Sequence, residues 1–112
     1  MIEITSASNP RYKTIKSLAQ KKERLKRGEF TVEGIKSVKD AIKAGALIDR
    51  IAISSSFYKN TDFEYPQGVH ILKTDDYLFN KLCDTETTPG TMAVIKMKNT
   101  PDFKPNLTNN YV

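Results

Sequence analysis

The sequence predicts an α/β fold in which helices flank a small mixed β-sheet. The first observation is the alternation of patterns along the chain: helix, strand, helix, strand, loop, strand, helix, strand. Alternation of this kind is typical of α/β layers. The second observation is size and composition, because 112 residues with 38% hydrophobic and 28% charged side chains fit one compact domain. No internal repeat is visible.

The first predicted helix covers residues 10–27 and is strongly basic. Asn9 is a suitable N-cap, Pro10 suits the first helical position, and Gly28 suits the end of the helix. At about 100° per residue, one side collects the apolar residues Tyr12, Ile15, Leu18, Ala19 and Leu25. The opposite side collects Lys13, Lys16, Lys21, Arg24 and Arg27. Three further cations, Arg11, Lys22 and Lys26, point toward the apolar side, so they must snorkel or the helix ends must splay.

The remaining elements follow from hydrophobic periodicity and from Gly, Pro, Asn and Asp signals. They are a strand at 30–33, a helix at 35–44, a strand at 48–53, a loop at 54–68 with at most one helical turn, a strand at 69–73, a short helix ending near Leu82, a loop at 84–91 and a strand at 92–97. Gly34 precedes the second helix and Gly45 closes it. Thr74 is expected to cap the last helix, with Asp75 and Asp76 at its positive end.

The positive charge is concentrated in the first quarter of the chain. Up to Gly28 there are eight Lys or Arg residues and two acids, whereas the rest has ten and eleven. Such a segment points to a polyanion, either nucleic acid or an anionic membrane surface. The alternative is a solvated lysine-rich helix that only aids solubility. No apolar run approaches the roughly 18 residues of a membrane span, and the first residues do not resemble a signal peptide.

Candidate catalytic residues are few. The sequence has one histidine, His70, and one cysteine, Cys83, so no metal cluster can be assembled at the usual spacing. Nothing in the spacing indicates that these two residues meet, and a single thiol fits a reducing cytoplasm. Asp75, Asp76 and Glu86 are explained by the helix dipole and by solvation. No glycine-rich phosphate loop and no nicotinamide or S-adenosylmethionine pocket is recognisable. We therefore expect a binding module, with no catalytic, cofactor-binding or metal-binding residue.

Several short motifs together resemble one family. They are Ile4-Thr5-Ser6, Asn9-Pro10, Lys13, Leu18, Lys21-Lys22-x-Arg24, Gly28-x-Phe30-x-Val32-Glu33-Gly34, Thr85-Glu86-Thr87-x-Pro89-Gly90 and Met92-Ala93-Val94. In this order they resemble the N-terminal substrate-binding domain of SpoU-type (TrmH-like) RNA ribose 2′-O-methyltransferases. The resemblance covers roughly residues 4–96.

The resemblance implies a fold, an activity and a division of labour. The fold would be the three-layer α/β/α sandwich, with a small mixed sheet, of the ribosomal proteins that bind kink-turn RNA. The full-length protein would be a cytoplasmic S-adenosylmethionine-dependent methyltransferase of RNA, commonly ribosomal RNA. Its cofactor, its catalytic residues and its homodimer contact would belong to a C-terminal trefoil-knotted domain. Residues 1–98 would bind RNA without catalysing the reaction, and residues 99–112 would be a linker and the start of that missing domain.

RNA contact is expected at three places. The first is the cationic helix face, where lysine and arginine neutralise phosphates. The second is the turn before the second helix, where backbone N–H groups face a ligand and where the kink-turn-binding relatives contact RNA. The third is the loop at 84–91, with its hydroxyls and exposed backbone. The predicted RNA-binding residues are Asn9, Lys13, Lys16, Lys21, Arg24, Arg27, Gly34, Lys36, Thr88 and Gly90.

Structural alternatives stay open at each place. Arg24 could pair with Glu33 instead of contacting RNA, because arginine also binds carboxylates in a planar, bidentate manner. Asn9 could serve first as a cap, and Gly34 could be needed only for the turn. Four aromatic residues could stack bases or could pin the loop to the core, which we favour: Phe57, Tyr58, Phe63 and Tyr65.

Two other functions compete with the methyltransferase hypothesis. One is a stand-alone RNA-binding or ribosome-associated protein of the same fold. The other is a structural arm that orients or dimerises an enzyme. The sequence following Val112 would distinguish these hypotheses most directly.

Overall fold

The computed structural model describes residues 1–83 and 89–97, which form five strands and five helices. The strands are β1 (Ile2–Ile4), β2 (Glu29–Glu33), β3 (Ile48–Ser54), β4 (His70–Thr74) and β5 (Thr91–Lys96). The helices are α1 (Pro10–Ser17), α2 (Lys21–Arg27), α3 (Ile35–Lys43), α4 (Ser55–Asn60) and α5 (Asp76–Leu82). None of the helices in the described part of the chain has the length and apolar character needed to cross a membrane.

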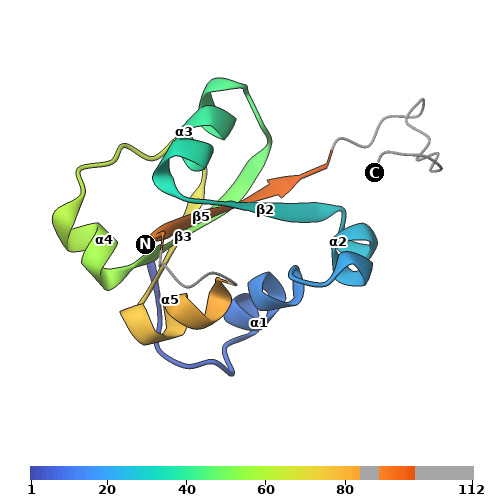
Figure 1. The fold of residues 1–112 in the computed structure, drawn as a ribbon, viewed down its shortest axis with the longest axis horizontal. Coiled ribbons are helices and arrows are strands. Elements are labelled where there is room, and N and C mark those ends of the chain that lie inside the picture. The colour runs from blue at the N-terminus through green and yellow to red at the C-terminus, as the bar shows by residue number, and fades with distance from the viewer. Residues whose placement is uncertain (84–88, 98–112) are drawn as a thin grey trace.

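The strands form one mixed sheet in the order β1-β4-β3-β5-β2. β1, β4 and β3 pair in parallel, whereas β5 runs antiparallel to both of its neighbours, β3 and β2. β2 therefore points in the same direction as β3 and β4. As a consequence, the turns that lead from β2, β3 and β4 into α3, α4 and α5 all lie at one edge of the sheet (Figure 1).

Two hydrophobic clusters fill the two faces of this sheet. Tyr12 and Ile15 of α1 and Phe79 of α5 pack against one face. Val38 of α3 packs against the other face, where Phe57 of α4 joins it. Figure 1 shows the resulting arrangement, with α3 and α4 on one side of the sheet and α1 and α5 on the other. The structure thus confirms the three-layer α/β/α sandwich with a mixed sheet.

The prediction of a single helix over residues 10–27 is wrong, because the helix is interrupted between α1 and α2. The Leu18 N–H bonds back to the Ile15 carbonyl and ends α1, and Gln20 is extended, with φ −96° and ψ 132°. Leu18 is buried, but α2 buries no residue and Leu25 is 65% exposed. A continuous helix would carry Lys22 and Lys26 into the core side. The break removes this conflict, since Lys22 and Lys26 are both exposed to solvent.

Four smaller predictions also need correction. β1 was not expected as a strand, since three residues are too few to show periodicity, yet Ile4 is buried and pairs with β4. Asp75, not Thr74, caps α5, because its carboxylate accepts the Leu78 N–H at 2.7 Å. Thr91, placed in a loop by the sequence, begins β5. Helix α4, with six residues, is longer than the single turn expected in the 54–68 loop. The other predicted helices and strands are confirmed to within one or two residues at each end.

Candidate nucleic-acid interface

Helix α1 is anchored firmly beneath its exposed lysines. The Asn9 side chain accepts the Arg11 N–H at 2.8 Å, which confirms Asn9 as the N-cap. Tyr12 is buried and donates its hydroxyl to the Leu78 carbonyl of α5 at 2.7 Å. Lys13, the next residue along this anchored helix, is exposed to solvent. The start of the basic segment is therefore a rigid platform.

The break after α1 divides the predicted cationic face into two groups. Lys13 and Lys16 line a hollow of about 430 Å³ together with Lys81 of α5. Arg27 instead lines a separate hollow of about 340 Å³ with Arg11. The expectation of one continuous face is therefore wrong, because the chain is extended at Gln20 and the two helices do not share one axis of periodicity.

Arg24 holds the break itself together. Its guanidinium donates to the carbonyls of Leu18 and Ala19, both at 3.0 Å. Hydrogen bonds from a charged donor are stronger than neutral ones, and these two satisfy carbonyls that the end of α1 leaves without a helical partner. Arg24 thus has a positioning role that neither of the two sequence-based alternatives anticipated. Its predicted contact with RNA stays a prediction.

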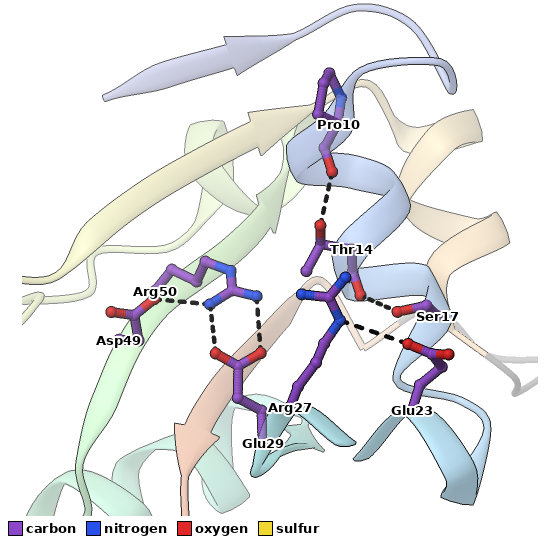
Figure 2. A network of polar contacts seen from close by, with 8 residues as sticks. All are labelled: Pro10, Thr14, Ser17, Glu23, Arg27, Glu29, Asp49 and Arg50. Carbon is purple, nitrogen blue, oxygen red and sulfur yellow. Dashed lines mark hydrogen bonds and ion pairs between the residues drawn. The ribbon is translucent and has the colours of Figure 1, made fainter. Parts of the chain in front are cut away.

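Arg27 lies beside a network of ion pairs that connects two strands (Figure 2). Arg50 of β3 reaches Glu29 of β2 with both terminal nitrogens, at 3.2 and 3.3 Å, and bonds Asp49 at 2.7 Å. Arg27 pairs with Glu23 at 3.6 Å within α2. Burial lowers the pKa of Arg50, but the hydrogen bonds and charges of Glu29 and Asp49 outweigh it and raise this pKa overall. Arg50 therefore binds both acids of this hollow, but its single charge balances only one of the two carboxylates.

Most cations of the basic segment lack a carboxylate partner. Of the eight lysines and arginines up to Gly28, only Arg27 forms an ion pair among residues 1–83 and 89–97. Lys16 donates to the Lys81 carbonyl and Arg24 to the two carbonyls at the break. The others have no side-chain partner within the described chain: Arg11, Lys13, Lys21, Lys22 and Lys26. An uncompensated group of this kind creates a positive field at the surface.

The second predicted contact, the turn between β2 and α3, has the expected shape. Gly34 has φ 98°, a conformation that suits glycine, and its N–H donates to the Thr91 carbonyl at 2.9 Å. No side chain caps α3, and Lys36 in its first turn has an 89% exposed side chain that pairs only with Asp40, at 3.4 Å. The first turn of α3 therefore presents a cation and uncapped N–H groups at the edge of the sheet where β2 ends.

The described end of the third predicted contact, which begins at Pro89, lies beside the second. A Cβ atom added to Gly34 would come within 4.0 Å of the Pro89 Cβ. Gly90 is buried, with φ 82°, and an added Cβ would lie 2.8 Å from Cδ1 of Phe57. Close packing thus requires Gly90, and the expectation of exposed backbone at this residue is wrong. Thr88 and the Thr85-Glu86-Thr87 motif lie outside the described residues.

The basic segment and the Gly34 turn lie at opposite ends of β2. This strand has five residues, which at about 3.4 Å each span about 17 Å. Figure 1 shows α2 at one end of β2 and the start of α3 near the other. The structure therefore brings the second predicted contact together with Pro89, in the described end of the third, but keeps the first apart from them.

The aromatic residues of the 54–68 loop mostly pin it to the core. Phe57, Phe63 and Tyr65 pack against the cluster under α3, with ring centroids 6.1 Å apart for Phe57–Phe63 and 4.9 Å for Phe63–Tyr65. The pinning role that the sequence favoured is confirmed for these three. Tyr58 differs, since its ring is exposed beneath the Lys73 ammonium.

His70 and Cys83 line different hollows. His70 lies in the hollow with Arg27, and Cys83 lies in the hollow with Lys13. Burial, together with the charge of Glu33, raises the pKa of Cys83 to about 12, so the thiol keeps its proton at neutral pH. In residues 1–83 and 89–97, no three His, Cys, Asp or Glu side chains gather where they could hold a metal ion.

Two groups near the basic segment were not identified from the sequence. Lys81 joins Lys13 and Lys16 although it is more than sixty residues away in the chain. The Arg50–Glu29 contact joins strands that are separated in the sheet by β5. Both depend on tertiary packing between distant segments, and no local sequence signal reveals either of them.

Comparison with known proteins places most of the chain in one group. A family model described as the MRM3-like substrate binding domain matches residues 9–93. The 23S rRNA (guanosine(2553)-2'-O)-methyltransferase RlmP of Bacillus subtilis (strain 168) is 31% identical over 97 residues. That alignment covers 87% of this chain but only 38% of the relative.

Solved structures show the same relation. An AdoMet-bound rRNA methyltransferase from Sinorhizobium meliloti matches 92% of this chain and 40% of its own, with 25% identity and a TM-score of 0.71. The SpoU methyltransferase AviRb from Streptomyces viridochromogenes, in complex with AdoMet, matches 84% and 38%, with 18% identity and a TM-score of 0.65. At that identity the second match shows the fold alone. The chain thus spans about two fifths of the length of these relatives.

Proposed function

The chain belongs to the MRM3-like substrate binding domain family, and on this premise we propose that it is the RNA-recognition domain of an S-adenosylmethionine-dependent RNA 2′-O-ribose methyltransferase. Ribosomal RNA is the proposed substrate, because RlmP of Bacillus subtilis, 31% identical to this chain, is named for 23S rRNA. We propose a cytoplasmic location as well.

The proposed division of labour assigns recognition to residues 1–98. Residues 99–112 would lead into a knotted domain that carries catalysis, the cofactor site and the contact between two subunits of a homodimer. We assign no residue of this chain to S-adenosylmethionine. Asp76, for instance, lines a hollow with Gly90. Its carboxylate already accepts hydrogen bonds from the backbone N–H and the hydroxyl of Ser56, so we do not assign it to the cofactor. The cofactor would supply the methyl group, and this chain would hold the RNA.

One observation carries the proposal: the basic segment is exposed and uncompensated. Five of its cations have no side-chain partner within the described residues, and the helices that present them are fixed by Asn9, Tyr12 and Arg24. Phosphates can therefore bind without first displacing a carboxylate and without ordering the backbone. Binding would release the counterions condensed on the RNA.

A salt series tests this proposal directly. If five cations neutralise phosphates of a single strand, log K should fall with log salt at a slope of about −3.5. The measurement is the fluorescence anisotropy of a labelled ribosomal RNA fragment titrated with the chain at several KCl concentrations. A salt-insensitive constant, or no binding even at low salt, would contradict the proposal.

A further inference from the structure

The hollow between α1 and α5 combines three cations with neutral polar and apolar groups. Its lining within the described residues includes no acid and consists of Lys13, Lys16, Lys81, Ser17, Gln20, Ala19, Leu82 and Cys83. Its volume is about 430 Å³. Anions are the ligands that such a lining favours, since each lysine offers three donors and a full charge.

This hollow has fixed walls. The Lys16 Nζ donates to the Lys81 carbonyl at 3.0 Å, and the Tyr12 hydroxyl donates to the Leu78 carbonyl at 2.7 Å. Both bonds join α1 to α5, which lie in the same layer in Figure 1. The two helices that carry these cations are therefore fixed to one another before any ligand arrives, which lowers the cost of ordering the site on binding.

An exposed aromatic ring lies one helical turn from this hollow. Tyr77 is 65% exposed, and the Lys81 ammonium lies 4.9 Å from the centroid of its ring. Asp75 and Asp76, which precede it on α5, are both engaged. The Asp75 carboxylate accepts the Leu78 N–H, and the Asp76 carboxylate accepts two donors of Ser56. Lys81 thus contacts the Tyr77 ring and also lines the hollow.

A second exposed tyrosine provides a contrast on α4. The Lys73 ammonium lies 4.7 Å from the ring centroid of Tyr58, a pairing similar to that of Lys81 and Tyr77. However, the Lys73 Nζ is also 3.0 Å from a carboxylate oxygen of Glu3. The Glu3 carboxylate neutralises Lys73 and repels phosphate. Tyr58 therefore has the same ring–lysine contact as Tyr77 but no adjacent site for an anion.

We propose that the α1–α5 hollow binds the phosphate backbone of single-stranded RNA and that a base of this strand stacks on Tyr77. The inference rests on the proposed function and specifies the form of its ligand. Bases in a duplex are stacked on one another and cannot lie on a protein ring, whereas splayed bases of a single strand do so readily. A cationic groove beside an exposed aromatic ring is the combination that binds single strands.

Tryptophan substitution tests the stacking, because the chain contains no tryptophan of its own. Tyr77→Trp should keep the fold, since the side chain is mostly exposed. Its emission should be quenched when oligouridylate is added, and less so when the oligouridylate is paired with oligoadenylate. Tyr58→Trp is the matched control and should show little quenching with either. Equal quenching in the two variants, or none at Tyr77→Trp, would overturn the proposed stacking.

Affinity measurements separate this inference from the proposed function. Tyr77→Ala should weaken oligouridylate binding about tenfold, within the range expected for one stacked base. Lys81→Ala should reduce the magnitude of the salt slope by about 0.7, whereas Lys43→Ala on α3 should leave it unchanged. If the unaltered chain binds with a steep salt slope but Tyr77→Ala and Lys81→Ala have no effect, the α1–α5 site is wrong and the proposed function stands. If the unaltered chain binds no RNA, both are overturned.

Discussion

We expect the ion pair between Arg50 and Glu29 to contribute measurably to the free energy of unfolding. The two side chains are only 14% and 11% exposed, and two hydrogen bonds join them. Glu29→Gln removes the carboxylate charge and leaves the guanidinium with Asp49, which is 34% exposed. Breaking a buried pair typically costs about 3–5 kcal/mol. Because Asp49 and solvent compensate in part, we expect a loss of about 2 kcal/mol.

Thermal and urea unfolding followed by circular dichroism measure this loss. A decrease of about 2 kcal/mol corresponds to a melting temperature lower by about 8 °C for a domain of this size. Replacing both partners, Glu29→Leu with Arg50→Met, should cost less than Glu29→Gln alone, since no buried charge is left behind. Asp40→Asn, which breaks the exposed pair with Lys36, is the control and should stay within about 0.5 kcal/mol. Equal effects of Glu29→Gln and Asp40→Asn would refute this reasoning.

Two further predictions concern packing and pH. Gly90→Ala should destabilise the chain by about 1 kcal/mol or more beyond Gly45→Ala, because both glycines have positive φ but only Gly90 faces Phe57, at 2.8 Å; equal urea midpoints would contradict this packing. Cys83 should react slowly with a thiol reagent at pH 8 in the folded chain and rapidly in denaturant, since its pKa is raised from 9.0 to about 12. The folded state holds that proton more tightly, so the stability it contributes is complete below about pH 9 and is lost as the pH rises toward 12; rapid labelling of the native chain would contradict this.

The sequence predicts the layers of this fold well because their signals are local. Apolar spacing in 35–44 and the β-type run at 48–53 each identify an element without knowledge of its partners. The short strand β1 was missed for the opposite reason: its formation depends on pairing with β4, where the partner of Ile2 is Leu72, seventy residues further along the chain. Elements that exist only through a distant partner leave little trace in a local pattern.

The basic segment shows the same limit for the candidate site. Residue types and charge indicated a polyanion contact, and the Asn9 cap is confirmed. The prediction of one cationic face was wrong because it assumed helical periodicity across Gln20, whose backbone is extended. Lys81 and Tyr77 could not be added from the sequence, since only the packing of α5 on α1 brings them to this segment. Charge was predictable, but its spatial grouping was not.

The most direct test of the central claim reverses charge on the basic segment and compares it with an equal reversal elsewhere. One variant carries Lys13→Glu, Lys16→Glu and Lys21→Glu. Its control carries three reversals on the helices of the opposite face, at Lys39, Lys43 and Lys59, all exposed. The measurement is the dissociation constant for a ribosomal RNA fragment at one fixed salt concentration.

Both variants change the net charge by the same amount, so a general effect of charge would weaken them equally. If the basic segment contacts phosphates, the first variant should bind about a hundredfold more weakly, at about 1 kcal/mol for each lost contact. The control should lose severalfold at most. Equal losses in the two variants, with both still folded, would contradict the assignment of RNA recognition to the basic segment.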